Sequence, residues 1–220
     1  MSQTVILACP TLEQELKEAI KSSASKAAVY FLPRHLHNDP KELHRYLQDK
    51  IDHFYNVDRI VLCVSRCGGG TAALHATTSE IIVPRTRDCL DILLSGSNLN
   101  ALQRNIRSIY YTASWMNFSK DSDIDLEKLT AKMGKEAAEG YLQQLYKNFN
   151  EFYIIDTGCY EVQDVKDYLA PLVRILNGTM TVIHGEFRIL HKITTENFDD
   201  DFVVIPKGGT IPSEVFLQNK

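Results

Sequence analysis

The chain has 220 residues, of which 44% are hydrophobic and 24% are charged, a composition typical of a globular protein and not of a disordered or fibrous one. The chain has 24 Lys and Arg against 28 Asp and Glu, which gives a formal charge of −4. The basic residues are scattered and form no cluster in the sequence, which argues against a nucleic-acid-binding protein. No stretch approaches the roughly 20 apolar residues of a membrane span, and the first residues lack the basic start of a signal peptide, so we expect a cytoplasmic protein that does not bind membranes.

Short apolar runs alternate with helical patterns in the first half of the chain. Helices are predicted to start at Thr11, where Gln14 completes a capping box, and at Asp39, an N-cap residue followed by Pro40 at the first helical position. Shorter helical segments are predicted at 72–74 and 89–94. Strands are predicted where the apolar runs are short and near-continuous, at 5–9, 27–32, 59–64 and 80–83. This alternation predicts an α/β fold, a mainly parallel sheet with helices on both faces.

The second half of the chain has a looser pattern. One long helix is predicted at 123–150 and another at 163–176, from their helix-favouring residues. Strands are predicted at 108–114, 151–156, 180–183, 187–193 and 202–205. Because no linker or repeat interrupts the chain, we expect residues 1–220 to form a single compact α/β domain. Two α/β halves divided near residue 120 are the alternative.

Cysteines follow the ends of three predicted strands. Ligands of an open parallel sheet bind beyond the carboxyl ends of its strands, where Cys9, Cys67 and Cys89 lie and where His37 follows a fourth strand. Cys63, by contrast, is expected mid-strand. Five cysteines, an odd number, are expected to stay reduced in the cytoplasm. Thiolates and imidazole are ligands of soft metals, so Cys9, His37, Cys67 and Cys89 predict a metal site, with zinc as first choice and an iron–sulfur cluster as an alternative. The simpler interpretation is that these are buried thiols that only fill the core.

Two other interpretations concern the loop after the third strand. Cys67 could be a reactive thiol, activated by a helix N-terminus and nearby arginines. The loop could instead bind a small anionic ligand through backbone amides, although it matches neither a Walker nor a dinucleotide motif, and three glycines also suit a tight turn. The candidate ligand-binding residues are Arg66, Gly68, Gly69, Gly70, Arg85, Arg87, Asp88 and, at the end of a later strand, Asp156.

Several motifs resemble one protein family over nearly the whole chain. They are Ile6-Leu7-Ala8-Cys9, Leu36-His37-Asn38, Val83-Pro84-Arg85 with Asp88-Cys89, Ile155-Asp156-Thr157-Gly158, and Asp200-Asp201-Phe202-Val203-Val204-Ile205-Pro206. The chain thereby resembles the domain of unknown function 1638 family of bacteria and archaea. The resemblance implies an α/β domain with family cysteines at positions 9, 67 and 89 and a histidine at position 37. The chain departs from the family pattern at Arg87, where relatives often have His. It also departs in the Gly68–Gly70 loop, where relatives often have a Ser-Asn-Gly sequence.

The resemblance also suggests, by association only, a role with corrinoid-dependent methyl transfer, and so a corrinoid cofactor or a methyltransferase partner protein. The leading hypothesis is a metal-thiolate protein, either an enzyme or a metal or corrinoid accessory factor. Its rivals are a module that binds a small anionic molecule without catalysis and a plain scaffold. The sequence decides neither whether the protein is an enzyme nor its oligomeric state.

Overall fold

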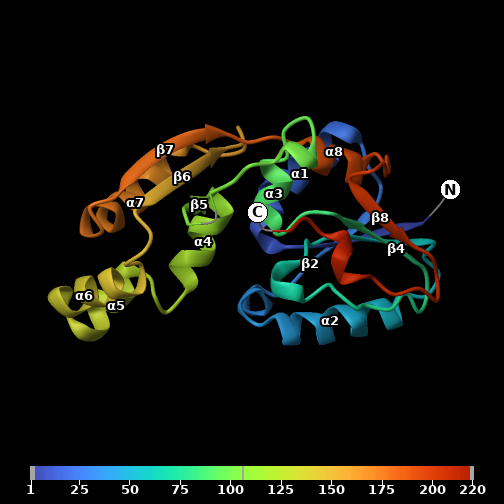
Figure 1. Cartoon of the computed structure of the whole chain (residues 1–220), viewed down its shortest axis with the longest axis horizontal. Coiled ribbons are helices and arrows are strands. Elements are labelled where there is room, and N and C mark those ends of the chain that lie inside the picture. The colour runs from blue at the N-terminus through green and yellow to red at the C-terminus, as the bar shows by residue number, and fades with distance from the viewer. Residues whose placement is uncertain (1–2, 106, 219–220) are drawn as a thin grey trace. The chain divides into compact units, whose positions relative to one another are not determined.

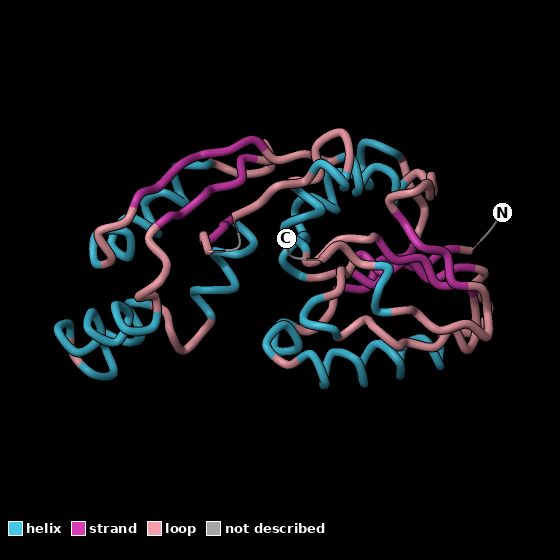
Figure 2. The backbone as a smooth tube through the Cα atoms, in the orientation of Figure 1, coloured by secondary structure: helices cyan, strands magenta, loops and turns pink. Residues whose placement is uncertain are grey.

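The computed structural model describes residues 3–105 and 107–218, and the chain divides into two compact units (Figures 1 and 2). Unit 1 contains Met1–Leu102 and Glu186–Lys220, and unit 2 contains Gln103–Gly185. The single α/β domain expected for residues 1–220 stays a prediction. The boundary lies at Gln103 and not near residue 120, where the two-halves alternative placed it.

Unit 1 is built on a five-stranded sheet. Its strands β1 to β4 are parallel, and β8 is antiparallel to β4 at one edge, so the predicted mainly parallel α/β fold is confirmed. The strands are, in spatial order, β2 (Ala28–Phe31), β1 (Thr4–Ala8), β3 (Arg59–Cys63), β4 (Glu80–Pro84) and β8 (Phe202–Ile205). The first four coincide with the apolar runs of the sequence to within one residue at each end.

Helices cover both faces of this sheet. On one face lies α2 (Pro40–His53), and on the other lie α1 (Glu13–Ser23), α3 (Cys89–Leu93) and α8 (Arg188–Thr194) (Figure 1). Val5 and Leu7 of β1 pack in one core cluster with Leu43 and Leu47 of α2, whereas Ile6 points to the opposite face and is also fully buried. Burial on both faces explains why these strands read as continuous apolar runs. Short 3₁₀ helices complete unit 1: η1 (Pro10–Leu12), η2 (Arg34–Asn38), η3 (Cys67–Gly69), η4 (Leu99–Ala101) and η5 (Ser213–Val215).

Unit 2 has a three-stranded parallel sheet of its own. Its strands, in spatial order, are β5 (Ile109–Tyr111), β6 (Glu151–Asp156) and β7 (Thr179–His184). Phe152 and Ile154 of β6 pack against Val165 and Leu169 of a helix, in a cluster that also contains Trp115, the only tryptophan of the chain. The helices of this unit are α4 (Ala113–Asp121), α5 (Leu126–Met133), α6 (Lys135–Leu145) and α7 (Val162–Ile175).

The strand predicted at 187–193 is wrong, because this segment forms α8. Ile189, Leu190 and Ile193 are fully buried, and their spacing of one and three residues matches one face of a helix and not the alternation of a strand. The apolar content is therefore that of a core helix.

Two predictions in unit 2 are also corrected. The single helix at 123–150 is two helices, α5 and α6, which are separated at Gly134 with φ +82°, a backbone conformation that favours glycine. The strand at 108–114 ends at Tyr111, because the Thr112 hydroxyl accepts a hydrogen bond from the amide of Trp115 and so caps α4.

The helix predicted at 72–74 is a turn, in which Ala73 has φ +61°. The capping box at Thr11 does not form either: α1 begins at Glu13 with Leu12 as N-cap and without a side-chain cap. The hydroxyl of Thr11 has other partners, described below.

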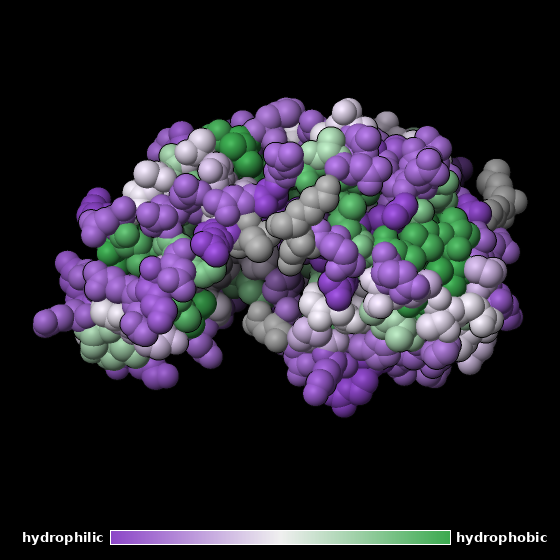
Figure 3. All heavy atoms as spheres, in the orientation of Figure 1, coloured by the Kyte–Doolittle hydropathy of each residue, from purple (hydrophilic) through white to green (hydrophobic). Residues whose placement is uncertain are grey.

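Hydrophilic side chains cover much of the face drawn in Figure 3, and apolar side chains emerge in separate patches, as on most globular proteins. Among the helices of the described residues, none combines the length and the apolar character required to cross a membrane.

Candidate thiol site

The carboxyl ends of β1, β3 and β4 bring cysteines to one edge of the unit 1 sheet. Cys9 directly follows β1, Cys63 is the last residue of β3, and Cys89 is the first residue of α3, after β4. The amide of Cys9 donates to the carbonyl of Cys63 over 3.0 Å, which fixes the ends of these neighbouring strands side by side.

A single hydroxyl joins two of these thiols. The Oγ1 atom of Thr11 lies 3.0 Å from the Sγ of Cys9 and donates a hydrogen bond to the Sγ of Cys89 over 3.1 Å. The 3₁₀ turn of η1, in which the amide of Leu12 donates to the carbonyl of Cys9, folds Thr11 back over the strand end. Cys9 and Cys89 are 4% and 1% exposed, so the pair is sheltered from solvent.

The thiols also perturb one another electrostatically. The pKa of the Cys89 thiol is raised well above its usual value, first by its hydrogen bond with Cys9, then by burial and by the charges of Cys9 and Asp88. Burial, with a smaller contribution from Cys89, raises the pKa of Cys63 to about 12. Burial also raises the pKa of Cys67, and the charges of Cys89 and Asp88 add to this effect. We call Cys9, Cys63, Cys67 and Cys89 the thiol cluster. The raised pKa values keep Cys63, Cys67 and Cys89 protonated at neutral pH unless a cation compensates the thiolates.

Cys67 lies at the strained start of the glycine loop. Its φ is +43°, a region that non-glycine residues rarely adopt, and its amide donates to the carbonyl of Arg87 over 3.1 Å. The glycines allow the loop to approach α2 closely: a Cβ on Gly68 would lie 2.9 Å from Pro40, and one on Gly70 would lie 2.8 Å from Leu43.

The loop amides have internal partners. The amide of Gly69 donates to the carbonyl of Arg66, and that of Gly70 donates to the carbonyl of Cys67. With the amide of Cys67 also engaged, these three donors do not converge on an open position for an anion. The glycines therefore have a packing role in the conformation seen here.

His37 and Asp88 belong to the same edge of the sheet. His37 lies in η2, which follows β2, and burial lowers the pKa of its imidazole, opposed by the negative charge of Asp88. Asp88 is the N-cap of α3, where its Oδ1 accepts hydrogen bonds from the amides of Leu90 and Asp91 at 3.0 and 3.2 Å. Asp88 thus acts electrostatically on His37, Cys67 and Cys89 alike.

The three candidate arginines differ in their surroundings. The Nε and Nη2 atoms of Arg87 donate to both carboxylate oxygens of Asp91 at 2.7 and 2.8 Å, and its amide donates to the same carboxylate at 3.0 Å. Asp91 is fully buried, so this ion pair is part of the structure of the loop. The Nε of Arg66 is buried and has no hydrogen-bond partner among the residues that the structure describes. Arg85 donates from its Nε to the carbonyl of Val215 at 3.0 Å.

Asp156 is the last residue of β6 in unit 2. Its Oδ1 accepts a hydrogen bond from the amide of Gly158 at 3.0 Å, the geometry of a turn that an aspartate stabilises locally.

The structure joins Cys9 and Cys89 through Thr11, and it places Cys67 and His37 after β3 and β2, at the same edge of the sheet. Within residues 3–105 and 107–218, no group of three or more His, Cys, Asp or Glu side chains stands in an arrangement that could hold a metal ion. Sequence reasoning missed Thr11, which was expected to cap a helix, and Cys63, which was expected mid-strand. The Cys-x-Thr spacing after β1 and the four-residue step from Cys63 to Cys67 were the available signals.

Comparisons with known proteins agree with the resemblance seen in the sequence. No curated protein and no solved structure matches the chain. One family model, described as "Protein of unknown function (DUF1638)", matches residues 31–194. This match covers most of the 220 residues and includes His37, Cys67 and Cys89. The chain therefore belongs to the DUF1638 family.

Proposed function

We propose that the thiol cluster of unit 1 binds a soft metal ion, with Cys9, Cys67 and Cys89 as ligands and His37 as the fourth. The observation that carries this proposal is the Thr11 hydroxyl, which lies within 3.1 Å of the Sγ atoms of both Cys9 and Cys89. Cys9 and Cys89 come from separate segments of the chain, and both are buried. Thiols that only fill a core need no such convergence at the ligand-binding edge of a parallel sheet.

The electrostatics of the cluster favour a cation. Each thiolate would raise the pKa of its neighbours, so several cannot ionise together unless a positive charge lies among them. A zinc ion supplies that charge and is held by cysteine thiolates and histidine. The ligands must turn toward the ion, because the side chains do not stand in a metal-holding arrangement in the structure described.

Zinc fits this site better than a larger group does. Cys9 and Cys89 contact the same hydroxyl and hydrogen-bond to each other. A zinc ion gathers its thiolates around one centre, whereas an iron–sulfur cluster spreads them over several irons. A zinc ion held by the three cysteines, with His37 displaced from the fourth position, could bind and activate the thiol of a substrate. Thiol or methyl-transfer chemistry, with a corrinoid or methyltransferase partner, is the part of this proposal that rests on the family association alone.

The experiment is metal analysis of the full chain purified without chelators or a histidine tag, together with Cys9→Ser, Cys67→Ser and Cys89→Ser variants. Cys159→Ser is the matched control, because Cys159 lies in unit 2. We expect about one ion per chain in the wild type and the control, and loss of most of it in each cluster variant. Replacement by Co²⁺ should give a thiolate-to-cobalt charge-transfer band that the cluster variants lack.

The proposal also predicts proton release, because thiols with raised pKa values must ionise to bind the metal. Metal affinity should therefore rise steeply with pH. Full metal content in all three cluster variants, or a wild-type protein that binds neither zinc nor cobalt when they are added, would overturn the proposal.

A further inference from the structure

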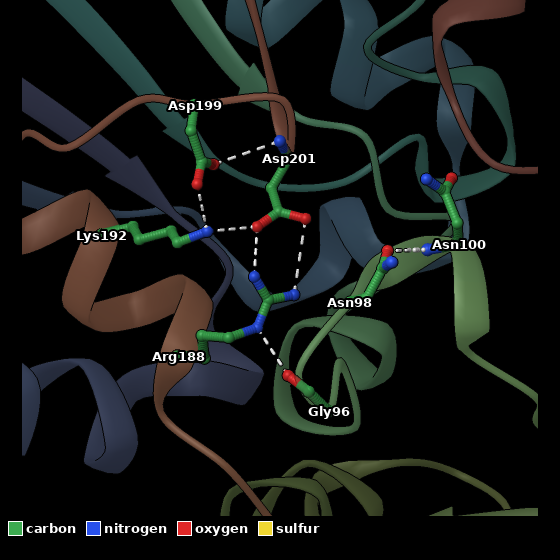
Figure 4. Close-up of polar contacts among 7 residues, drawn as sticks. All are labelled: Gly96, Asn98, Asn100, Arg188, Lys192, Asp199 and Asp201. Carbon is green, nitrogen blue, oxygen red and sulfur yellow. Dashed lines mark hydrogen bonds and ion pairs between the residues drawn. The ribbon is translucent and has the colours of Figure 1, made fainter.

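A second site is suggested by a polar cavity of about 270 Å³ in unit 1. It lies where Arg85 follows β4 and where the turn Asp199–Asp201 leads into β8, so it shares the ligand-binding edge of the sheet. The rest of its wall comes from Leu217, from the η4 segment and from α8, as Figure 4 shows for Asn98, Asn100, Arg188 and Lys192. A volume just below the range of drug-sized pockets suits a small molecule.

Ion pairs hold much of the wall in place. Arg188 forms a two-pronged ion pair with Asp201, and its Nε donates to the carbonyl of Gly96 at 2.5 Å (Figure 4). Lys192 donates to Asp199 over 2.6 Å and also to Asp201. These contacts join α8, the loop before η4 and the turn before β8. The side chains of the cavity are thus positioned before any ligand arrives, which lowers the entropic cost of binding.

Two opposite charges on the wall are not used by these pairs. Arg85 is anchored by the hydrogen bond from its Nε to the carbonyl of Val215, and it has no acidic partner within residues 3–105 and 107–218. Asp200, between the two paired aspartates, likewise has no basic partner in this part of the chain. A guanidinium presents further N–H donors that match a carboxylate. A carboxylate such as Asp200 attracts an ammonium group.

We propose that this cavity binds a small zwitterion with the chemistry of a free α-amino acid, its carboxylate on Arg85 and its ammonium group on Asp200. The Oδ1 of Asn98 accepts a hydrogen bond from the amide of Asn100 at 2.8 Å, which orients the Asn98 side chain and leaves its NH₂ group for polar atoms of the ligand. The six charged side chains of the wall, three basic and three acidic, sum to zero, which suits a ligand without net charge better than an anion.

The test is calorimetry and saturation-transfer NMR on the full chain, with each free amino acid as a separate probe. Matched probes are the same molecules without the amino group, the same molecules without the carboxylate, and inorganic phosphate. We expect at least one amino acid to bind and its two truncated analogues to bind roughly tenfold more weakly, because each lacks one charge-assisted hydrogen bond. Arg85→Gln and Asp200→Asn should weaken binding by a similar factor, and Arg45→Gln on the exposed face of α2 should not.

Each other outcome counts against the proposal. A simple carboxylate or phosphate that binds as tightly as the amino acid would show an anion site, and full affinity in Asp200→Asn would remove the ammonium contact. Binding of none of the amino acids would overturn the site altogether. Asp200 is exposed, so its variant remains informative if Arg85→Gln fails to fold. Cys89→Ser should leave binding intact, which separates this proposal from the metal site.

Discussion

The buried ion pair between Arg87 and Asp91 provides a strict test of how the thiol cluster is held. Three hydrogen bonds from Arg87 end on the carboxylate of Asp91, whose side chain is 0% exposed, while that of Arg87 is 12% exposed. The carbonyl of Arg87 also accepts the amide of Cys67. The pair therefore stiffens the segment that connects β4 to Cys89.

Asp91→Asn removes the negative charge and leaves the guanidinium largely buried. Breaking a buried pair in this way costs about 3–5 kcal/mol, and because Arg87 retains some solvent contact we expect a loss of about 3 kcal/mol. A local opening free energy lowered by that amount raises the population of the open form about a hundredfold.

The assay is thiol labelling resolved for each cysteine by peptide mass spectrometry. Cys63 and Cys89 react only when unit 1 opens, because they are 0% and 1% exposed. Their labelling rates should rise about a hundredfold in Asp91→Asn, while Cys159 of unit 2 serves as an internal control. Unit 1 needs such a probe because the single tryptophan, Trp115, reports on unit 2.

Two further variants complete this test. Asp49→Asn on α2 is the control, because its side chain is 58% exposed and lies 3.8 Å from Lys50, and such surface pairs contribute less than about 1 kcal/mol. Replacing Arg87 and Asp91 together by Met and Leu should restore part of the lost protection, since apolar side chains need no partner, while the backbone amide of residue 87 still loses its acceptor. A labelling rate of Cys63 in Asp91→Asn within about threefold of the wild-type rate would refute the reasoning, because a threefold change corresponds to a change in opening free energy of less than about 1 kcal/mol.

Three more predictions concern stability. Gly185→Ala should destabilise unit 2 by about 2 kcal/mol or more, because the added Cβ would lie 2.6 Å from a side-chain carbon of the sheet. Gly140→Ala, inside α6, should stabilise unit 2 by about 0.5–1 kcal/mol, because the added Cβ meets no described atom within 4 Å. Urea unfolding followed by tryptophan fluorescence measures both changes in the free energy of unfolding. Burial lowers the pKa of His37 in the folded chain below 6.5, so the unfolded chain binds more protons and stability should fall as the pH drops from 6.5 toward the lowered pKa. Melting temperatures of His37→Gln, measured across this pH range, should no longer fall in this way. An unchanged pH dependence would assign the effect to another group. Thr86→Val should lower the opening free energy of unit 1 by about 1–3 kcal/mol in the same thiol-labelling assay, because the buried Ser65 hydroxyl, 2.6 Å from that of Thr86, would lose its partner. An unchanged labelling rate would show that the Ser65 hydroxyl finds another partner.

Much of the fold of unit 1 could be predicted because burial on both faces leaves a strong local signal. The runs that became β1, β3 and β4 are apolar at nearly every position, and Asp39 with Pro40 marks the start of α2. The strand predicted at 187–193 failed because a short segment with four apolar residues, at 187, 189, 190 and 193, is compatible with a buried helix as well as with a strand.

The site could be predicted only as far as topology determines it. Parallel strands place Cys9 and Cys89 at one edge, which the sequence pattern predicts. The role of Thr11 depends on a contact with Cys89, 78 positions away, and local capping rules favoured a different use of its hydroxyl. The pairing of Arg87 with Asp91 was equally hidden, since an arginine near a glycine loop resembles an anion ligand until its carboxylate partner is known.

The order of the chain has a consequence for how the protein is made. Unit 2 is an insertion, so unit 1 leaves off at Leu102 and resumes at Glu186. Ile81 of β4 pairs with Ile205 of β8, and α8 is also synthesised late. On the ribosome, β4 therefore remains an open sheet edge while all of unit 2 emerges and can fold. Contacts between residues far apart in the sequence, such as those between β4 and β8, form slowly. This order of segments along the chain therefore exposes the edge of β4 to aggregation during synthesis.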